Sequence, residues 1–301
     1  MVTVCLPTSK AASLAGPMPG AEVLTWNGST PAPQGIERTE FLVLSHGSPY
    51  AEIMAATPQL KVVQATSAGI EYLLGLIPAG VTLCDGRGIH GGPVSEWILA
   101  GILASVRELP GFLRAQERAE WTEHGTGELA GKRVLIVGAG DLGRQTARRA
   151  RAFDAEPVLV GRKAREGVHG SDELPALLPS ADVVVLVVPI TDETRHMVDA
   201  EFLARMRDGA LLVNAARGQV VITEALLAEL ESRRLHAVLD VTDPEPLPPD
   251  HPLWRAPNLL LTPHVAGTVS GYQPRAYALV REQIGRYGSG EQLLNVVHGA
   301  Y

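Results

Sequence analysis

Short apolar runs alternate with polar or helical segments along the first ninety residues. The runs have the length of strands, and they cover Val2 to Leu6, Val23 to Trp26, Phe41 to Ser45, Lys61 to Thr66 and Val81 to Cys84. Between them lie a proline- and glycine-rich stretch at residues 27–35 and a short predicted helix from Tyr50 to Ala56. This alternation predicts a small parallel sheet with helices of its own.

A second series of strand-like runs begins at Val134. It comprises Val134 to Val137, Val158 to Val160, Val183 to Val188, Leu211 to Asn214, His236 to Asp240 and Leu259 to Thr262. Near-continuous apolar runs are typical of parallel strands that helices cover on both faces. Six is the number of strands in a doubly wound dinucleotide-binding sheet, whose ligand lies at the carboxyl ends of the strands. The predicted fold class is therefore α/β, with a Rossmann cofactor domain and a smaller flavodoxin-like α/β domain.

A long helix is predicted between the two series, from Val94 to Leu109. Gly91-Gly92-Pro93 is expected to close the first domain before it, and Pro110 to end it. Its apolar stripe is wider than one contact needs. The stripe is compatible with a homodimer interface on one side of the helix, and equally with burial wholly within one chain.

The last helix is predicted from Tyr272 to Tyr287, with an apolar face that includes Tyr277, Val280 and Ile284. Because the second strand series is complete before it, this helix is expected to return to the first domain. We therefore expect a discontinuous substrate-binding domain of residues 1–97 and 270–301. The dinucleotide-binding domain would then span residues 98–269.

Composition narrows the class of protein. The 301 residues carry a formal net charge of -7, which offers no basic field for nucleic acid and favours a small-molecule partner. Cys5 and Cys84 lie in apolar runs without disulfide or metal-ligand spacing, so we expect core thiols and no metal site. The amino-terminal segment is too short for a secretory signal, and no apolar run approaches a membrane span. These features predict a cytoplasmic protein.

Gly138, Gly140 and Gly143 have the G-x-G-x-x-G spacing. The bare motif also occurs in glycine-rich turns that bind nothing. Here it joins a buried strand to an amphipathic helix, predicted from Asp141 to Phe153 with Phe153 facing the sheet. In that context the glycines allow a tight turn, close approach of a diphosphate and close helix–strand packing.

The next strand indicates which cofactor is preferred. An NAD-specific site has an acid at the end of this strand to bind the ribose hydroxyls. Here the strand runs into Gly161-Arg162-Lys163, with no acid at its end. Arg162 and Lys163 suit a 2′-phosphate, which predicts NADP(H) over NAD(H). The alternative is that these cations decorate a solvated turn.

Three titratable or charged residues follow buried strands: Arg217, Glu245 and His264. Each alone is explained as well by a solvated loop, but all three are expected at one sheet edge. Together they suit reversible reduction of a 2-oxo acid. The guanidinium would bind the carboxylate and polarise the carbonyl, the imidazole would donate the proton, and the glutamate would orient the imidazole.

These motifs together resemble the D-isomer-specific 2-hydroxyacid dehydrogenases, which include glyoxylate/hydroxypyruvate reductases and phosphoglycerate dehydrogenases. The likeness covers nearly the whole chain. It is carried by the glycine turn, the three strand-end segments, Leu60-Lys61-Val62-Val63, Ser67-Ala68-Gly69-Ile70-Glu71, Ser95-Glu96-Trp97 and Val188-Pro189-Ile190-Thr191-Asp192-Glu193-Thr194. The resemblance implies an NAD(P)-dependent, homodimeric oxidoreductase that reduces a small 2-oxo acid to the D-2-hydroxy acid.

The resemblance also implies site residues. Arg217, Glu245 and His264 would be catalytic, and the backbone of Ala68 and Gly69 would receive the substrate carboxylate beside Arg217 and His264. Cofactor contacts would come from Gly138, Ala139, Gly140, Asp141, Leu142, Gly143, Gly161, Arg162, Lys163, Val188, Pro189, Thr194, Ala215, Ala216, Asp240 and Ala266, with Asp240 near the nicotinamide amide. The sequence departs from the family at Glu71, where Asp is frequent, and at Ser95-Glu96-Trp97. His46 and Ser48 are further candidates for substrate contact or for a solvated loop.

Other functions remain open on sequence alone. Corepressors similar to this family keep the fold and the triad but bind peptides, although this chain shows no disordered tails that would extend its reach. Formate dehydrogenases resemble the family too, but they typically have glutamine where Glu245 stands. Phosphite oxidation is compatible with the triad.

Overall fold

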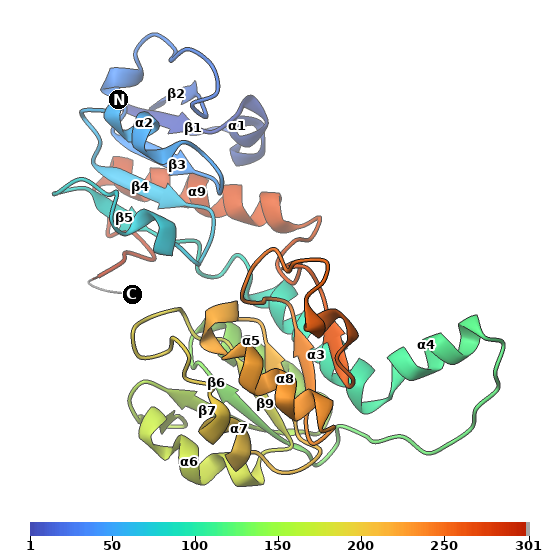
Figure 1. Ribbon diagram of the computed structural model, residues 1–301. Coiled ribbons are helices and arrows are strands. Elements are labelled where there is room, and N and C mark those ends of the chain that lie inside the picture. The colour runs from blue at the N-terminus through green and yellow to red at the C-terminus, as the bar shows by residue number, and fades with distance from the viewer. Residues whose placement is uncertain (299–301) are drawn as a thin grey trace. The chain divides into compact units, whose positions relative to one another are not determined.

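The computed structural model describes residues 1–298, which form two compact units (Figure 1). Unit 1 comprises Met1–His90 with the segment from Val269 onward, and unit 2 comprises Gly91–Thr268. The first boundary lies earlier than the expected residue 97, because helix α3 (Gly91–Val106) belongs to unit 2 from its first residue. None of the helices in the described chain has the length and apolarity that crossing a bilayer requires.

Unit 1 is built on a parallel sheet of five strands in the order β2-β1-β3-β4-β5. Its strands are β1 (Val2–Leu6), β2 (Ala21–Thr25), β3 (Phe41–Leu44), β4 (Val62–Ala65) and β5 (Thr82–Cys84). Its helices are α1 (Ser9–Ala15), α2 (Tyr50–Ala55) and α9 (Tyr272–Ser289). The apolar face of α9, with Val280 and Ile284, packs in one core with Val4 and Phe41 of the sheet.

Unit 2 is built on a parallel sheet of seven strands in the order β12-β11-β10-β9-β6-β7-β8. The strands are β6 (Arg133–Val137), β7 (Glu156–Gly161), β8 (His169–Gly170), β9 (Val183–Leu186), β10 (Leu211–Asn214), β11 (His236–Leu239) and β12 (Leu259–Leu261). The six predicted strands are all present, and the two-residue β8 extends one edge. The predicted α/β class, with a Rossmann sheet and a second α/β domain, is confirmed.

Helices cover both faces of the unit 2 sheet. They are α3, α5 (Asp141–Arg151), α6 (Leu174–Leu177), α7 (Ala200–Arg205) and α8 (Thr223–Glu231), whereas α4 (Leu109–Glu117) projects away from the sheet (Figure 1). Alternate residues of β6 enter different cores: Val134 and Ile136 pack with α3 and α5, whereas Leu135 and Val137 pack with α6, α7 and α8. This two-sided burial explains the continuous apolar strand sequences.

Helix ends were predicted less well than strands. The helix expected to run to Leu109 ends at Val106, and Glu108 turns the chain with φ 52. Pro110 then lies in the first turn of α4, where its missing N–H is harmless. Gly91-Gly92-Pro93 forms the first turn of α3, and the first stretch of unit 1 ends immediately before it at His90, as predicted. Phe153 does not face the sheet: α5 ends at Arg151, and Phe153 is 44% exposed.

Candidate active site

The order of strands in unit 2 places the predicted site residues in two neighbouring groups. Strands β10, β11 and β12 are adjacent, and the segments after them carry Arg217, Glu245 and His264. Strands β9, β6 and β7 are adjacent as well, and the segments after them hold most of the predicted cofactor residues; the others, Ala215, Ala216, Asp240 and Ala266, follow β10, β11 and β12. All these strands are parallel, so both groups lie at one edge of the sheet.

His264 and Glu245 form a direct pair. The Nδ1 atom of His264 lies 2.5 Å from Oε1 of Glu245, and the two side chains are 49% and 41% exposed. A carboxylate hydrogen-bonded to Nδ1 fixes the orientation of the ring and leaves Nε2 for another partner. The Nε2 atom is then the proton-donating position of the ring.

The turn that carries His264 is held by Asp240. His264 has φ 53, a left-handed conformation that a non-glycine residue adopts only when its surroundings enforce it. Its backbone N–H donates to the Asp240 carbonyl at 2.7 Å. The buried Asp240 carboxylate accepts hydrogen bonds from Thr262 Oγ1 at 2.6 Å, from Val265 N at 2.8 Å and from Ala266 N at 2.9 Å. These bonds assign Asp240 a positioning role, and its contact with nicotinamide stays a prediction.

Arg217 stands in a tight turn after β10. The buried Asn214 shapes this turn, because its Nδ2 donates to the Arg217 carbonyl and its Oδ1 accepts from Ala216 N, both at 3.0 Å. A Cβ on Gly218 would lie 1.9 Å from the Thr242 carbonyl oxygen. The Arg217 turn is therefore in close backbone contact with the segment that leads to Glu245.

The glycine turn fits a dinucleotide diphosphate. Gly138 has φ 122, and a Cβ on it would lie 2.4 Å from the Val187 carbonyl oxygen. A Cβ on Gly143 would lie 1.8 Å from the Gly138 carbonyl oxygen. Gly140 differs, since no atom lies within 4 Å of the place its Cβ would occupy. Two glycines thus serve backbone packing, whereas Gly140 leaves open space at the amino end of α5, where an anion is stabilised.

The ends of β7 and β9 border this turn. Gly138 N donates to Val160 O at 2.8 Å, and Gly161 lies beside Ala139. Arg162 and Lys163 follow, both exposed. In the loop after β9, Thr194 Oγ1 donates to Pro189 O at 2.6 Å. The guanidinium of Arg162 forms an ion pair with Glu193 of this same loop.

In unit 1, the predicted substrate residues Ala68 and Gly69 lie in the loop after β4. Ser67 Oγ donates to the Gly69 carbonyl at 2.9 Å and is hydrogen-bonded to Tyr72 Oη at 2.9 Å. The His46 ring stacks on Tyr72 with centroids 5.2 Å apart. Burial raises the pKa of Tyr72 to about 12, so its hydroxyl stays protonated at neutral pH.

A family model describes more than half of the chain. Residues 99–266 match the NAD binding domain of D-isomer specific 2-hydroxyacid dehydrogenases. The chain belongs to this family. A glyoxylate reductase of Thermofilum pendens is 34% identical over 252 residues, which cover 78% of this chain and 74% of that protein.

Two solved structures of this dehydrogenase family are similar over almost the full length. One is a D-isomer specific 2-hydroxyacid dehydrogenase from Xanthobacter autotrophicus in complex with NADPH and MES, with TM-score 0.86, 31% identity and 99% and 98% of the two chains covered. The other is an NADPH-dependent glyoxylate/hydroxypyruvate reductase from Sinorhizobium meliloti in complex with NADP and sulfate, with TM-score 0.86, 29% identity and the same coverage.

Several residues that shape the site of this dehydrogenase were not singled out from the sequence. Asn214 and Thr262 act through hydrogen bonds to the turns that bear Arg217 and His264. Glu193 pairs with Arg162 only because β9 and β7 flank β6 in the sheet. For Asn214, the signal was its position as a polar residue at the end of a buried strand.

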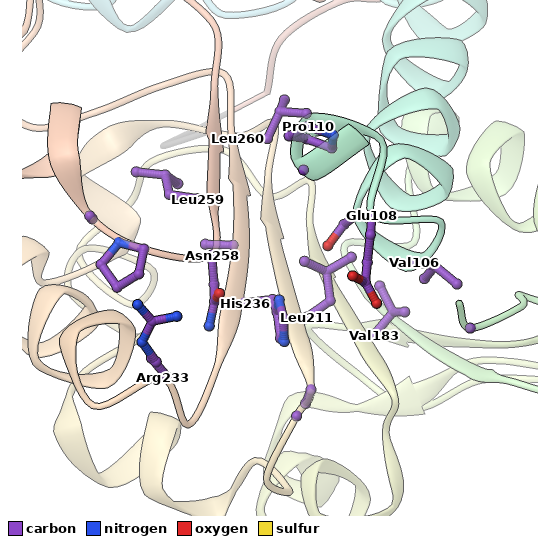
Figure 2. Close-up of a pocket in the computed structure, with 18 of the residues that line it drawn as sticks. Val106, Glu108, Pro110, Val183, Leu211, Arg233, His236, Asn258, Leu259 and Leu260 are labelled. Carbon is purple, nitrogen blue, oxygen red and sulfur yellow. The ribbon is translucent and has the colours of Figure 1, made fainter. Parts of the chain in front are cut away.

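A large cavity of unit 2 lies away from the catalytic groups. It measures about 830 Å³ and is lined by the first residues of four strands, Val183, Leu211, His236 and Leu259 (Figure 2). Burial lowers the pKa of His236. Because the first residues of four parallel strands line it, the cavity lies at the amino edge of the sheet, opposite the edge that carries His264.

Proposed function

We propose that the chain reduces a small 2-oxo acid of the glyoxylate or hydroxypyruvate kind to the D-2-hydroxy acid. The observation that carries this proposal is the pair of His264 and Glu245 in the segments after β12 and β11, next to the turn after β10 that bears Arg217. The glyoxylate reductase of Thermofilum pendens and the glyoxylate/hydroxypyruvate reductase of Sinorhizobium meliloti support the substrate class.

In this mechanism, the bound cofactor supplies the hydride. Arg217 binds the substrate carboxylate and polarises the carbonyl with its guanidinium, whose planar fork matches a carboxylate. His264 donates its Nε2 proton to the carbonyl oxygen as negative charge develops there, and Glu245 stabilises the imidazolium before the transfer. Ala68 and Gly69 add backbone donors to the carboxylate.

We propose NADP(H) as the preferred cofactor. Arg162 and Lys163 follow β7, and the strand ends in Gly161 without a carboxylate that would repel a 2′-phosphate. The NADPH and NADP complexes of the two structural relatives support this choice. Val188, Pro189, Thr194, Ala215, Ala216 and Ala266 complete the proposed cofactor contacts.

We also propose a homodimer, with a surface different from the one expected. The middle of α3 is buried within unit 2, with Ile98 and Ile102 both 0% exposed. Exposed apolar side chains lie instead on α4 and the segment after it: Leu113 is 60% and Trp121 is 95% exposed. Figure 1 shows α4 projecting away from the sheet of unit 2. Light scattering at micromolar concentration should give a dimer mass, and a monomer mass would contradict the proposal.

A substrate panel tests the activity. Oxidation of NADPH and NADH is followed with glyoxylate, hydroxypyruvate, pyruvate and bulkier 2-oxo acids, and reduction of NADP⁺ and NAD⁺ with phosphite. We expect the highest kcat/KM with glyoxylate or hydroxypyruvate and NADPH. Turnover of phosphite alone, or of none of these compounds, would refute the proposed function.

A further inference from the structure

Arg162 and Glu193 form an ion pair across the cofactor edge of unit 2. Arg162 follows β7, whereas Glu193 lies in the loop after β9. Both side chains are exposed, at 73% and 59%, so the pair is accessible to solvent and to a ligand.

The pair spans the end of strand β6. In the sheet order β9-β6-β7, β6 lies between the two strands that carry the partners. Neighbouring strands are about 4.8 Å apart, so β7 and β9 are about 10 Å apart, and the glycine turn that begins at Gly138 follows the strand between them. The adenosine half of a dinucleotide binds at this end of a doubly wound sheet.

Arg165, another cation of the same turn, forms different interactions. Arg165 donates from Nη2 to the Ala139 carbonyl at 3.3 Å and from Nη1 to the Lys163 carbonyl at 3.5 Å. These bonds tie Arg165 to the backbone of the glycine turn and of its own loop. Arg162, by contrast, pairs with a carboxylate, that of Glu193. Glu193 therefore controls whether the Arg162 guanidinium is available to bind a ligand.

We propose that Glu193 sets the strength of the NADPH preference by competing with the 2′-phosphate for Arg162. This inference rests on the proposed cofactor site. In the free protein Glu193 holds the guanidinium, and a 2′-phosphate must displace this carboxylate to form its own bidentate pair. NADH carries no 2′-phosphate, so the competition does not affect it. Glu193 is thereby a specificity-determining residue that lies outside the end of β7, where the sequence motif locates the residues that select the cofactor.

The test is direct binding of reduced cofactor to the full chain without substrate, followed by nucleotide fluorescence. We expect Glu193→Gln to bind NADPH about 5-fold more tightly, the size of one exposed ion pair, and NADH within about 2-fold of wild type. The gain should shrink at high salt, because an exposed pair is screened. Unchanged NADPH affinity, or an equal gain for NADH, would overturn the proposal.

A matched control is Glu201→Gln on α7. Glu201 forms an exposed ion pair with Arg205 at 2.7 Å, so this variant removes the same charge and a similar pair away from the cofactor edge. We expect no change in the affinity for either cofactor. A gain equal to that of Glu193→Gln would show that net charge alone is responsible, which also overturns the proposal.

The Arg162→Ala variant separates this inference from the proposed function. It should weaken NADPH binding about 10-fold and leave NADH binding nearly unchanged, and adding Glu193→Gln to it should then give no further gain. If Arg162→Ala has no effect on NADPH binding, the proposed phosphate site and the inference both fail. If Arg162→Ala weakens binding but Glu193→Gln leaves it unchanged, only the inference fails.

Discussion

His264 illustrates at the scale of single residues how the catalytic edge is built. Its left-handed backbone, with φ 53, costs about 1 kcal/mol for a residue with a Cβ. The cost is offset by the carboxylate and carbonyl of Asp240, which together accept four hydrogen bonds from residues 262–266. The conformation of the turn at His264 therefore depends on a buried acid 24 residues earlier in the chain, directly after β11.

The catalytic pair gives the first prediction. His264→Ala and Glu245→Gln should each lower kcat for 2-oxo acid reduction by about 10²-fold or more, because the first removes the proposed proton donor and the second the carboxylate that pairs with it. Steady-state kinetics measures the loss. Cofactor affinity in the absence of substrate serves as the control and should change little. A near-normal kcat in His264→Ala would remove this histidine as the acid.

Asp240 gives the second prediction. In Asp240→Asn one carboxylate oxygen becomes an amide NH₂, which leaves the backbone N–H of Val265 or of Ala266 without an acceptor. We expect the free energy of unfolding to fall by about 1–3 kcal/mol and kcat to fall with it. Urea denaturation measures the stability. Thr262→Val, which removes one donor and strands no backbone group, should cost less; equal costs would contradict the assigned role.

At the scale of elements, the sequence was most informative about strands and least about turns. Continuous apolar runs rich in β-branched residues, such as residues 183–186, are typical of buried strands in a covered sheet, so the strands were predicted in nearly their observed places. The end of α3 was not, because Glu108 turns the chain by adopting a positive φ that no local pattern announces. The Arg162–Glu193 pair could not be predicted either, because it depends on the order of the strands in the sheet, which differs from their order in the chain.

The glycine turn gives the third prediction. Gly140→Ala should fold with nearly normal stability, since its Cβ would meet no atom within 4 Å, yet it should weaken cofactor binding because that space admits the diphosphate. Gly143→Ala should instead destabilise unit 2, since its Cβ would lie 1.8 Å from the Gly138 carbonyl oxygen. Thermal unfolding and cofactor titration of both variants distinguish the two roles. Normal cofactor affinity in Gly140→Ala would contradict the assignment.

At the scale of the whole molecule, the two units divide the work that the strand-end motifs imply. Unit 2 carries the proposed catalytic residues Arg217, Glu245 and His264 and the glycine turn, and unit 1 carries the loop of Ala68 and Gly69. The placement of Arg217, Glu245 and His264 at one edge of the sheet could be predicted from sequence, because parallel strands bring their carboxyl ends to one edge. The aromatic stack of His46 and Tyr72 could not be predicted, since these residues follow different strands and no spacing links them.

Unit 1 also contains both cysteines, and they give the last prediction. Cys5 and Cys84 are fully buried, and desolvation raises the pKa of each thiol from 9.0 to about 11. Below pH 9 the thiols are protonated in both states and stability is unaffected. Between pH 9 and 11 the unfolded chain loses thiol protons that the native state keeps, so the free energy of unfolding falls with rising pH.

Each buried thiol contributes at most about 3 kcal/mol over this window, from about 1.4 kcal/mol per pKa unit. Burial likewise raises the pKa of Tyr72 and Tyr287 to about 12, which adds a loss in the same direction only from about pH 10. Urea unfolding is therefore measured at closely spaced pH values from 8 to about 10, below most tyrosine ionisation, so that the change in the free energy of unfolding comes mainly from the thiols. Cys84→Ala loses stability at all pH values through its cavity, but its slope above pH 9 should be shallower than that of wild type. A slope that Cys84→Ala leaves unchanged would show that this thiol is not the titrating group.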